Sequence, residues 1–488
     1  MDRVEAPQTR CRAGFARADI TPPVGIYHRL WGAALHERST GVHRPLLATA
    51  MWIEPAEPDT GNAQLILALD QCLLDREDIA AIQDRVGQVV PLRPDQVHVA
   101  CSHTHASGWM SRSRAPYPGG ELIEPYLKRL SHVCADLARQ ASATAQPATI
   151  VYRSSRCSLA AHRDYFDTDR QQFVCGFNPA GWADDTLLVG RVTADDGKTV
   201  GTLVNYACHP TTLAWENTLL SPDFVGAMRE IVEQLTGAPC LFLQGASGDL
   251  GPRDGFVADS AVADRNGRQL GFAALSGLEA TPPPGCQFEY TGPVVSGATL
   301  GIWRHRPVDA DPAASQSVWN WRTVTVDLPY RLDLPTVDAT KAKLARWEAE
   351  RESARIAHDL DRMRDCHAQV ERANRQLARL AALPAGKTYP YRIILARVGT
   401  ALWVLAPGEL YQVFQTTLRE RLPDAAVVVA TLVNDWQPGY LPTAESYGRG
   451  IYQETIAVVA PGSLEMLIEA VTRELRTLWE HRTTENSE

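Results

Sequence analysis

Several short segments of this sequence hold side chains that could bind a metal or move a proton. In the segment CSHTHASG, at 101–108, His103 and His105 lie two residues apart and follow the apolar run VHVA. In an extended chain, residues at this spacing point to the same face. Imidazole is the commonest protein ligand for metals such as zinc. The pair is therefore a candidate metal site, although a lone HxH pattern is a weak signal.

Two further segments end apolar, strand-like runs with polar residues. His209, in NYACHPTTL, closes such a run and precedes Pro210, which cannot continue a strand ladder. That position suits a functional site, and a hydrogen-bonded core histidine is the alternative. The segment FLQGASGDLGP ends in small residues and Asp249. Small residues let the backbone approach a ligand closely, whereas a tight turn with Asp249 capping a neighbouring element is an equally good interpretation.

The last two segments lie in the C-terminal part of the chain. In LAPGELYQVF, Glu409 follows Pro-Gly at the start of a predicted helix. A carboxylate there either favours the helix dipole or acts as a metal ligand at a strand-to-helix turn. A loop rich in Gly and Pro, within 433–453, then presents Tyr440, Tyr447 and Tyr452. Loops held by a rigid scaffold are where functional residues concentrate.

The elements that must position these residues alternate along the chain, and this predicts an α/β layered fold. Predicted strands are 46–54, 65–72, 97–101, 186–193, 199–207, 240–243, 391–405 and 426–433, and predicted helices are 76–90, 121–140, 224–235 and 464–479. Residues 254–335 carry many Pro and Gly and predict less regular structure. Residues 336–383 contain neither and have apolar residues at helical spacing. They predict one long helix or a helical hairpin, either a structural arm or a lid over the site.

Composition narrows the class of protein. Hydrophobic residues make up 45% and charged residues 22% of the 488 positions, which are ordinary globular values. A net charge of −9 argues against a nucleic-acid partner. The N-terminus has no apolar signal-peptide core, and no run of about 18 apolar residues predicts a membrane span. The ten cysteines form no CxxC pair, so we expect free thiols in a soluble, cytoplasmic protein. A homo-oligomer remains possible.

Taken in order, the motifs resemble the catalytic N-terminal domain of neutral (non-lysosomal) ceramidases and their bacterial relatives. The resemblance runs from about residue 14 to about residue 460. Its pieces are ADITPPVG, GVHRPLLATA, the run ending in Asp70, SHTHASG, ACHPTTL, SPDFVG, QGASGDLGP, PGEL and GYLPTAESYGRGIY.

This resemblance implies a mixed-sheet α/β fold and a zinc-dependent amidohydrolase with one zinc ion per chain. Carried over position by position, the implied ligands are His103, His209, Glu409 and Tyr440. A phenol is an uncommon zinc ligand, so Tyr440 could instead hydrogen-bond the water on the metal. Two neutral imidazoles and one carboxylate leave a net positive charge on the zinc. That charge lowers the pKa of bound water toward about 7, so that a metal-bound hydroxide attacks the amide carbonyl.

The resemblance also implies roles around the metal. His105 would be a proton donor or oxyanion stabiliser close to the metal, and Tyr452 would contact the reacting carbonyl. Arg163, in AAHRDYF, lies where the family has an arginine in its site, with a looser motif match.

The sequence departs from the family pattern in three respects. Gly251 stands in GDLGP where the family has a serine that has been proposed as catalytic. No C-terminal immunoglobulin-like domain and no secretory signal are recognised, so we expect a single catalytic domain over 1–488. These departures favour a small soluble amide over ceramide. An esterase or lactonase using the same site, and a non-catalytic metal-binding relative, are the alternatives.

Overall fold

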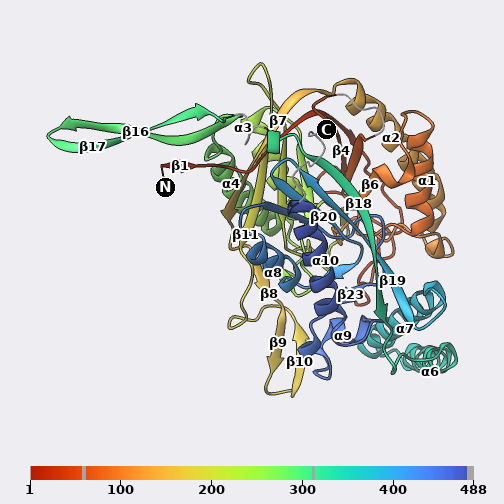
Figure 1. The fold of residues 1–488 in the computed structure, drawn as a ribbon. Coiled ribbons are helices and arrows are strands. Elements are labelled where there is room, and N and C mark those ends of the chain that lie inside the picture. The colour runs from red at the N-terminus through yellow and green to blue at the C-terminus, as the bar shows by residue number, and fades with distance from the viewer. Residues whose placement is uncertain (1, 58–61, 310–313, 481–488) are drawn as a thin grey trace.

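A computed structural model describes residues 2–57, 62–309 and 314–480, and its secondary structure forms four layers in the order helices, large sheet, small sheet, helices (Figure 1). Within the described residues the large sheet has eight strands, in the order β14-β12-β11-β7-β2-β4-β5-β6. Its strands are Gln8–Asp19 (β2), Leu47–Pro55 (β4), Gln64–Leu69 (β5), Val97–Cys101 (β6), Gln146–Arg156 (β7), Thr186–Ala194 (β11), Thr199–Tyr206 (β12) and Cys240–Gln244 (β14). The β5–β6 and β12–β14 pairs are parallel and the others are antiparallel, so the sheet is mixed, as predicted.

Alternating side chains bury both faces of this sheet. In β4, Ala50 and Trp52 face one helical layer, whereas Met51 and Ile53 belong to the core between the two sheets. This alternation follows from the two-residue period of a strand. The helices on the outer face are Arg76–Gly87 (α1), Ile123–Ala143 (α2), Phe224–Thr236 (α3) and Ser260–Glu279 (α4).

The small sheet covers the inner face of the large one. Its strands are Trp319–Pro329 (β18), Thr388–Val398 (β19), Ala401–Leu405 (β20) and Ala426–Ala430 (β22), in that order. Trp403 on β20 packs into the core between the sheets and donates from Nε1 to the Tyr152 hydroxyl on β7, 3.2 Å away. The opposite face is covered by Val413–Arg421 (α8) and Ser463–Glu480 (α10).

The segment that follows β22 connects the two edges of the large sheet. The amide of Thr431 donates to Gln244 at the end of β14, and the amide of Cys101, at the end of β6, donates to Leu432. Asn434 also exchanges hydrogen bonds with Val99 on β6. Edge strands β6 and β14, far apart in strand order, therefore meet through this segment, which brings the carboxyl ends of β6 and β12 to one place.

A buried ion pair joins two of the motif segments. Asp70, just after β5, accepts two hydrogen bonds from Arg229 on α3, at 2.8 and 2.9 Å, and also accepts from the amide of Leu47. Both partners are almost completely buried. Asp223 caps α3 by accepting from the amide of Phe224. These contacts fix α3 against the strand ends.

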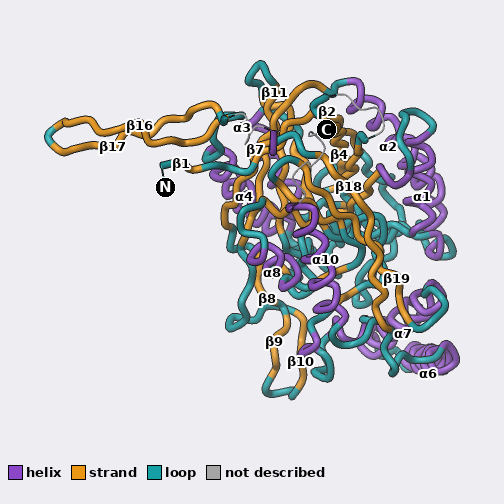
Figure 2. Tube along the Cα trace, in the orientation of Figure 1, coloured by secondary structure: helices purple, strands orange, loops and turns teal. Residues whose placement is uncertain are grey.

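The prediction of less regular structure over 254–335 was wrong. Helix α4 lies there, and Cys286–Ser296 (β16) and Ala298–Pro307 (β17) form a long hairpin that pairs with Arg3–Val4 (β1) and extends away from the layers (Figures 1 and 2). Gly267 lies within α4, where a Cβ would collide with the Phe224 carbonyl oxygen of α3, and Gly292 lies at a β-bulge that the hairpin accommodates. Strand β2 and strand β7 were also not predicted.

Residues 336–383 form the helical hairpin that their pattern predicts, with Val337–Ile356 (α6) and Leu360–Ala382 (α7). Glu371 on α7 forms a buried ion pair with Arg114, 2.7 Å between charged atoms, and so anchors the hairpin to the body. In the part of the chain that the structure describes, no helix combines the length and the apolar character needed to cross a bilayer.

Candidate metal centre

The candidate ligands lie just after the ends of three strands. His103 and His105 follow β6, His209 follows β12, and Glu409 belongs to the short strand Glu409–Leu410 (β21) after β20. Strand β21 pairs in parallel with Tyr440–Leu441 (β23), in a register that places Glu409 opposite Tyr440. The prediction that Glu409 begins a helix was therefore wrong, because Glu409 lies in β21 and α8 starts only at Val413.

Three atoms converge at the centre. Nε2 of His209 lies 2.9 Å and Nε2 of His103 lies 3.3 Å from Oε2 of Glu409. The three side chains form a group whose ligand atoms all lie within 4.8 Å of one another, a spacing that could hold a metal ion. Two imidazoles with one carboxylate are a familiar zinc donor set.

Backbone carbonyls fix which ring nitrogen faces this centre. Nδ1 of His103 lies 2.9 Å from the carbonyl oxygen of Cys72, and Nδ1 of His209 lies 2.6 Å from that of Ser247. A carbonyl oxygen only accepts, so each Nδ1 must carry the proton. When the ring is neutral, it presents its Nε2 lone pair to the centre, as in metal sites whose ligand histidines are oriented by a second hydrogen bond.

The electrostatic environment of His103, His209 and Glu409 favours a positive charge between their three converging side-chain atoms. Burial acts to raise the pKa of Glu409, but His103 and His209 outweigh it and hold that pKa well below its ordinary value. Burial acts to lower the pKa of His103, but the Cys72 thiol and Glu409 raise it well above the usual range. Burial, with Arg163, lowers the pKa of His209 to about 4. A carboxylate and two imidazoles buried together thus favour a cation between them.

A second group of possible ligands shares His103 and consists of Cys72, His103 and His105. The Cys72 sulfur lies 3.6 Å from Nδ1 of His103, the nitrogen that donates to the Cys72 carbonyl. A metal bound between this sulfur and Nδ1 would break that hydrogen bond. The group with His209 and Glu409 uses the free Nε2 and fits a metal better.

The backbone around His103 differs from the predicted extended chain. Strand β6 ends at Cys101, and His103 has a left-handed conformation with φ 69°. The amide of His105 then donates to the carbonyl of Pro210, which turns the loop toward the end of β12. The expectation that both histidines extend from one strand face was wrong, because the chain has already left the ladder.

His105 nevertheless reaches the edge of the centre. Its Nε2 lies 3.4 Å from Nε2 of His103, and its ring is farther from His209 than the His103 ring is, at 6.0 against 4.8 Å between centroids. Burial, followed by the two neighbouring histidines, lowers the pKa of His105 well below its usual value, so the ring is neutral near pH 7. The Trp31 ring packs against it at 5.0 Å.

The tyrosines and Arg163 form the opposite side. The Tyr440 hydroxyl lies 3.4 Å from Nε2 of His209, and burial raises the pKa of this phenol well above its usual value, which keeps its proton in place. The Arg163 guanidinium lies over the Tyr440 ring at 5.3 Å and donates to the Gly248 carbonyl. Tyr452, on Tyr452–Ile456 (α9), packs edge-on against Tyr440 at 5.9 Å and is 46% exposed.

Two other residues singled out in the sequence have structural contacts instead. Asp249 accepts hydrogen bonds from the amide and side chain of Gln412, at the start of α8, so it caps a neighbouring element. The Tyr447 hydroxyl donates to the carbonyl of Val459.

We compared this fold with those of solved structures. No protein-family model matches the sequence. Neutral ceramidase from Pseudomonas aeruginosa superposes with a TM-score of 0.64 and 16% identity, over 96% of this chain and 74% of that one. A structure described as ceramidase complexed with C2 gives a TM-score of 0.63 and 17% identity, over 97% and 76%. The chain has the fold of a neutral ceramidase. The fold expected from the ordered motifs is thereby confirmed.

Within this neutral ceramidase fold, the seven predicted site residues lie together. His103, His209 and Glu409 form the central group, and the other four lie beside it. Sequence reasoning missed Trp31, which packs on His105, and Arg379 of α7, a buried arginine whose pKa Tyr452, Glu409 and Tyr440 act to raise against the effect of burial. Trp31 belongs to no recognised motif. Arg379 lies in a helix with many arginines, so its pattern did not distinguish it.

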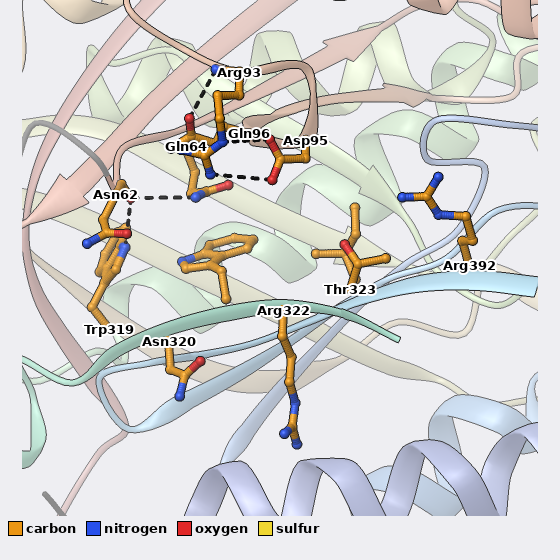
Figure 3. Close-up of a pocket in the computed structure, with 12 residues that line it drawn as sticks. Asn62, Gln64, Arg93, Asp95, Gln96, Trp319, Asn320, Arg322, Thr323 and Arg392 are labelled. Carbon is orange, nitrogen blue, oxygen red and sulfur yellow. Dashed lines mark hydrogen bonds and ion pairs between the residues drawn. The ribbon is translucent and has the colours of Figure 1, made fainter. Parts of the chain in front are cut away.

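A cleft of about 450 Å³ lies away from the metal centre of the ceramidase-like fold, between β18 and the segments near Gln64 and Asp95 (Figure 3). Its polar groups are largely engaged within the fold. Arg93 pairs with Asp95 at 3.1 Å, and Trp319 donates to the Asn62 carbonyl. Figure 3 shows Arg322 pointing out of the cleft, where it pairs with Glu474 on α10. This cleft therefore has the character of a structural crevice.

Proposed function

We propose that this protein is a zinc-dependent hydrolase that cleaves the carbon–nitrogen amide bond of a small soluble substrate. The residues that would hold the zinc ion are His103, His209 and Glu409, with Tyr440 as the fourth group of the site. Zinc bound there would act as a Lewis acid and supply the nucleophile for hydrolysis near neutral pH.

The observation that carries the proposal is the orientation of the two histidines. Both keep Nδ1 on a backbone carbonyl and turn Nε2 toward the same carboxylate oxygen of Glu409. Such an arrangement requires positive charge at its centre, which either a proton on Nε2 of His103 or a bound cation would supply. The ceramidase fold adds support, since the two solved neighbours carry that name.

The other side chains would serve the amide. His105, neutral and beside the centre, can donate a hydrogen bond to the developing oxyanion, or take a proton from the attacking water and pass it to the leaving nitrogen. The protonated Tyr440 phenol can donate a second hydrogen bond, and the Arg163 guanidinium over its ring adds positive charge nearby. Trp31 excludes water from one side of His105, and Tyr452 lies at the exposed rim, where it would contact the carbonyl group of an entering substrate.

The test is metal content measured together with hydrolysis of a panel of N-acyl amides, esters and lactones. We expect about one zinc per chain and the highest kcat/KM on an amide. A higher kcat/KM on esters or lactones would replace amidase with esterase or lactonase at the same site. Bound zinc without turnover of any panel member would indicate a non-catalytic metal-binding protein.

A further inference from the structure

Arg379 on α7 is a buried cation without an acidic partner. It is 6% exposed, and within the described residues its guanidinium makes one hydrogen bond, from Nη1 to Oε1 of Gln376 at 2.7 Å. Its Nε has no hydrogen-bond partner in the described structure. An arginine keeps its charge when it is buried, and a buried charge without a partner is costly.

The neighbouring arginine on the same helix shows the contrast. Arg375, one turn earlier, pairs with Glu371 at 2.9 Å, and Glu371 also pairs with Arg114 on the body. This cluster balances its charges internally and holds the hairpin in place. Arg379, one turn further along, is more deeply buried than Arg375 and has no such acid.

The hairpin that carries Arg379 packs against the loop of Trp31, whose ring lies on His105 beside the candidate metal centre. In this packing, Arg375 donates to the Leu30 carbonyl, and a Cβ at Gly32 would lie 3.1 Å from Cβ of Ala368. Burial lowers the pKa of the Arg379 guanidinium, Tyr452, Glu409 and Tyr440 act to raise it, and the like charge of Arg375 acts to lower it. Helix α7 is thus a wall of the site.

A second buried arginine lies over the ring of Tyr440. Arg163 is 4% exposed, donates to the Gly248 carbonyl, and has no ion-pair partner in the described residues; its Nε also has no hydrogen-bond partner. Among the described residues, the two buried guanidinium groups therefore have no ion-pair partner, and an anionic ligand would stabilise them.

We propose that Arg379 binds a carboxylate of the substrate, so that the enzyme acts on N-acyl compounds whose amine portion is an acid, such as N-acyl amino acids. This deepens the proposed function and rests on it. A guanidinium can hold a carboxylate through two parallel hydrogen bonds, which fixes the orientation of the neighbouring amide. In this assignment the α6–α7 hairpin is a fixed wall that selects the substrate.

The experiment compares N-butanoyl amino acids with the matching N-butanoyl amino amides, which differ only in the carboxylate. The wild-type enzyme should prefer the acids, and Arg379→Gln should lower kcat/KM on the acids about 100-fold while changing that on the amides less than about threefold. Arg372→Gln, an exposed arginine of the same helix, is the matched control and should change neither. Equal wild-type kcat/KM for acids and amides would overturn the proposal.

A binding measurement separates this proposal from the hydrolase proposal. The probes are 4-oxoheptanoate, in which a methylene replaces the amide nitrogen of N-butanoylglycine, and its neutral amide, titrated calorimetrically into the protein as isolated. We expect the acid to bind more tightly than its amide to the wild type and to Arg372→Gln, and this difference to be lost in Arg379→Gln. Such a result without any hydrolysis would refute the hydrolase and keep the anion site. Hydrolysis without a difference in affinity between the acid and its amide would refute the anion site and keep the hydrolase proposal.

Discussion

Nε2 of His209 and Oε2 of Glu409 lie 2.9 Å apart, although 200 positions separate the two residues in the chain. The His209 proton is held on the other ring nitrogen by the Ser247 carbonyl. The contact therefore brings two electron-pair donors together, as expected for two side chains that bind the same metal ion.

Zinc binding should depend on both central histidines. His103→Ala and His209→Ala are each expected to lower zinc from about one per chain to below about 0.1, because each removes a ligand. His132→Ala, an exposed histidine on α2, is the control. Elemental analysis measures the loss, and full zinc occupancy in either site variant would refute the ligand assignment.

Removing the metal should leave the fold intact. Extensive apolar cores lie between the sheets and beneath both helical layers, so the chain does not depend on a metal to fold as a zinc finger does. We expect chelation to abolish hydrolysis while a cooperative melting transition persists in circular dichroism. Loss of that transition after chelation would contradict this prediction.

His105→Ala should separate metal binding from turnover. The variant is expected to keep zinc and to lose about 10²-fold to 10⁴-fold in kcat, as is typical when a general acid or oxyanion donor is removed. Steady-state kinetics with metal analysis on the same sample make the comparison. The role assigned to His105 would be lost if zinc disappeared together with activity, or if turnover stayed normal.

Long-chain ceramide should be a poor substrate. Gly251 has no hydroxyl, and two apolar chains would have to lie near the buried charge of Arg379. We expect kcat/KM on ceramide micelles to be at least about 100-fold below that on the best small amide. In Gly251→Ser the new Cβ would lie 3.8 Å from Oγ1 of Thr211, an ordinary contact, so this variant should fold normally. Efficient ceramide cleavage by the wild type would count against the small-substrate proposal.

The Asp70–Arg229 pair should matter for stability. Asp70→Asn keeps the size of the side chain but leaves the buried Arg229 charge without its partner, which we expect to cost about 3–5 kcal/mol of unfolding free energy. Asp95→Asn breaks an exposed pair with Arg93 and should cost less than about 1 kcal/mol. Denaturant unfolding measures both, and similar losses in the two variants would contradict the prediction.

His98 should make stability depend on pH. Burial lowers its pKa from 6.5 to about 4, so the unfolded chain takes up a proton at a higher pH than the folded protein does. The stabilisation is complete above about pH 6.5 and falls with decreasing pH, by about 2 kcal/mol at pH 5. His98→Gln can keep the hydrogen bond to Gln64, 2.8 Å long, without titrating. Its unfolding free energy should therefore fall less between about pH 7.5 and pH 5 than that of the wild type, and equal decreases would refute the assignment.

Sequence patterns were sufficient for most of the elements that carry the site. The apolar run 97–101 matches β6, and the helical spacing over 336–383 matches the α6–α7 hairpin. These predictions succeed because strand and helix periods are local properties of the chain. The long β2 and β7 strands were missed, since the small and polar residues among them obscure the two-residue pattern.

The residue types at the centre were also readable in advance, because each stands in a distinct motif whose order matched a known family. Sequence alone could not show that Nδ1 of His103 is held by the Cys72 carbonyl, or that His103 has left-handed backbone, since both depend on contacts with other segments. Sequence alone also could not show that Arg379 is buried without an acidic partner among the described residues. The hydrogen-bond partners of His103 and the burial of Arg379 depend on segments that are distant in sequence and come into contact only in the folded protein. No local sequence pattern can predict such contacts.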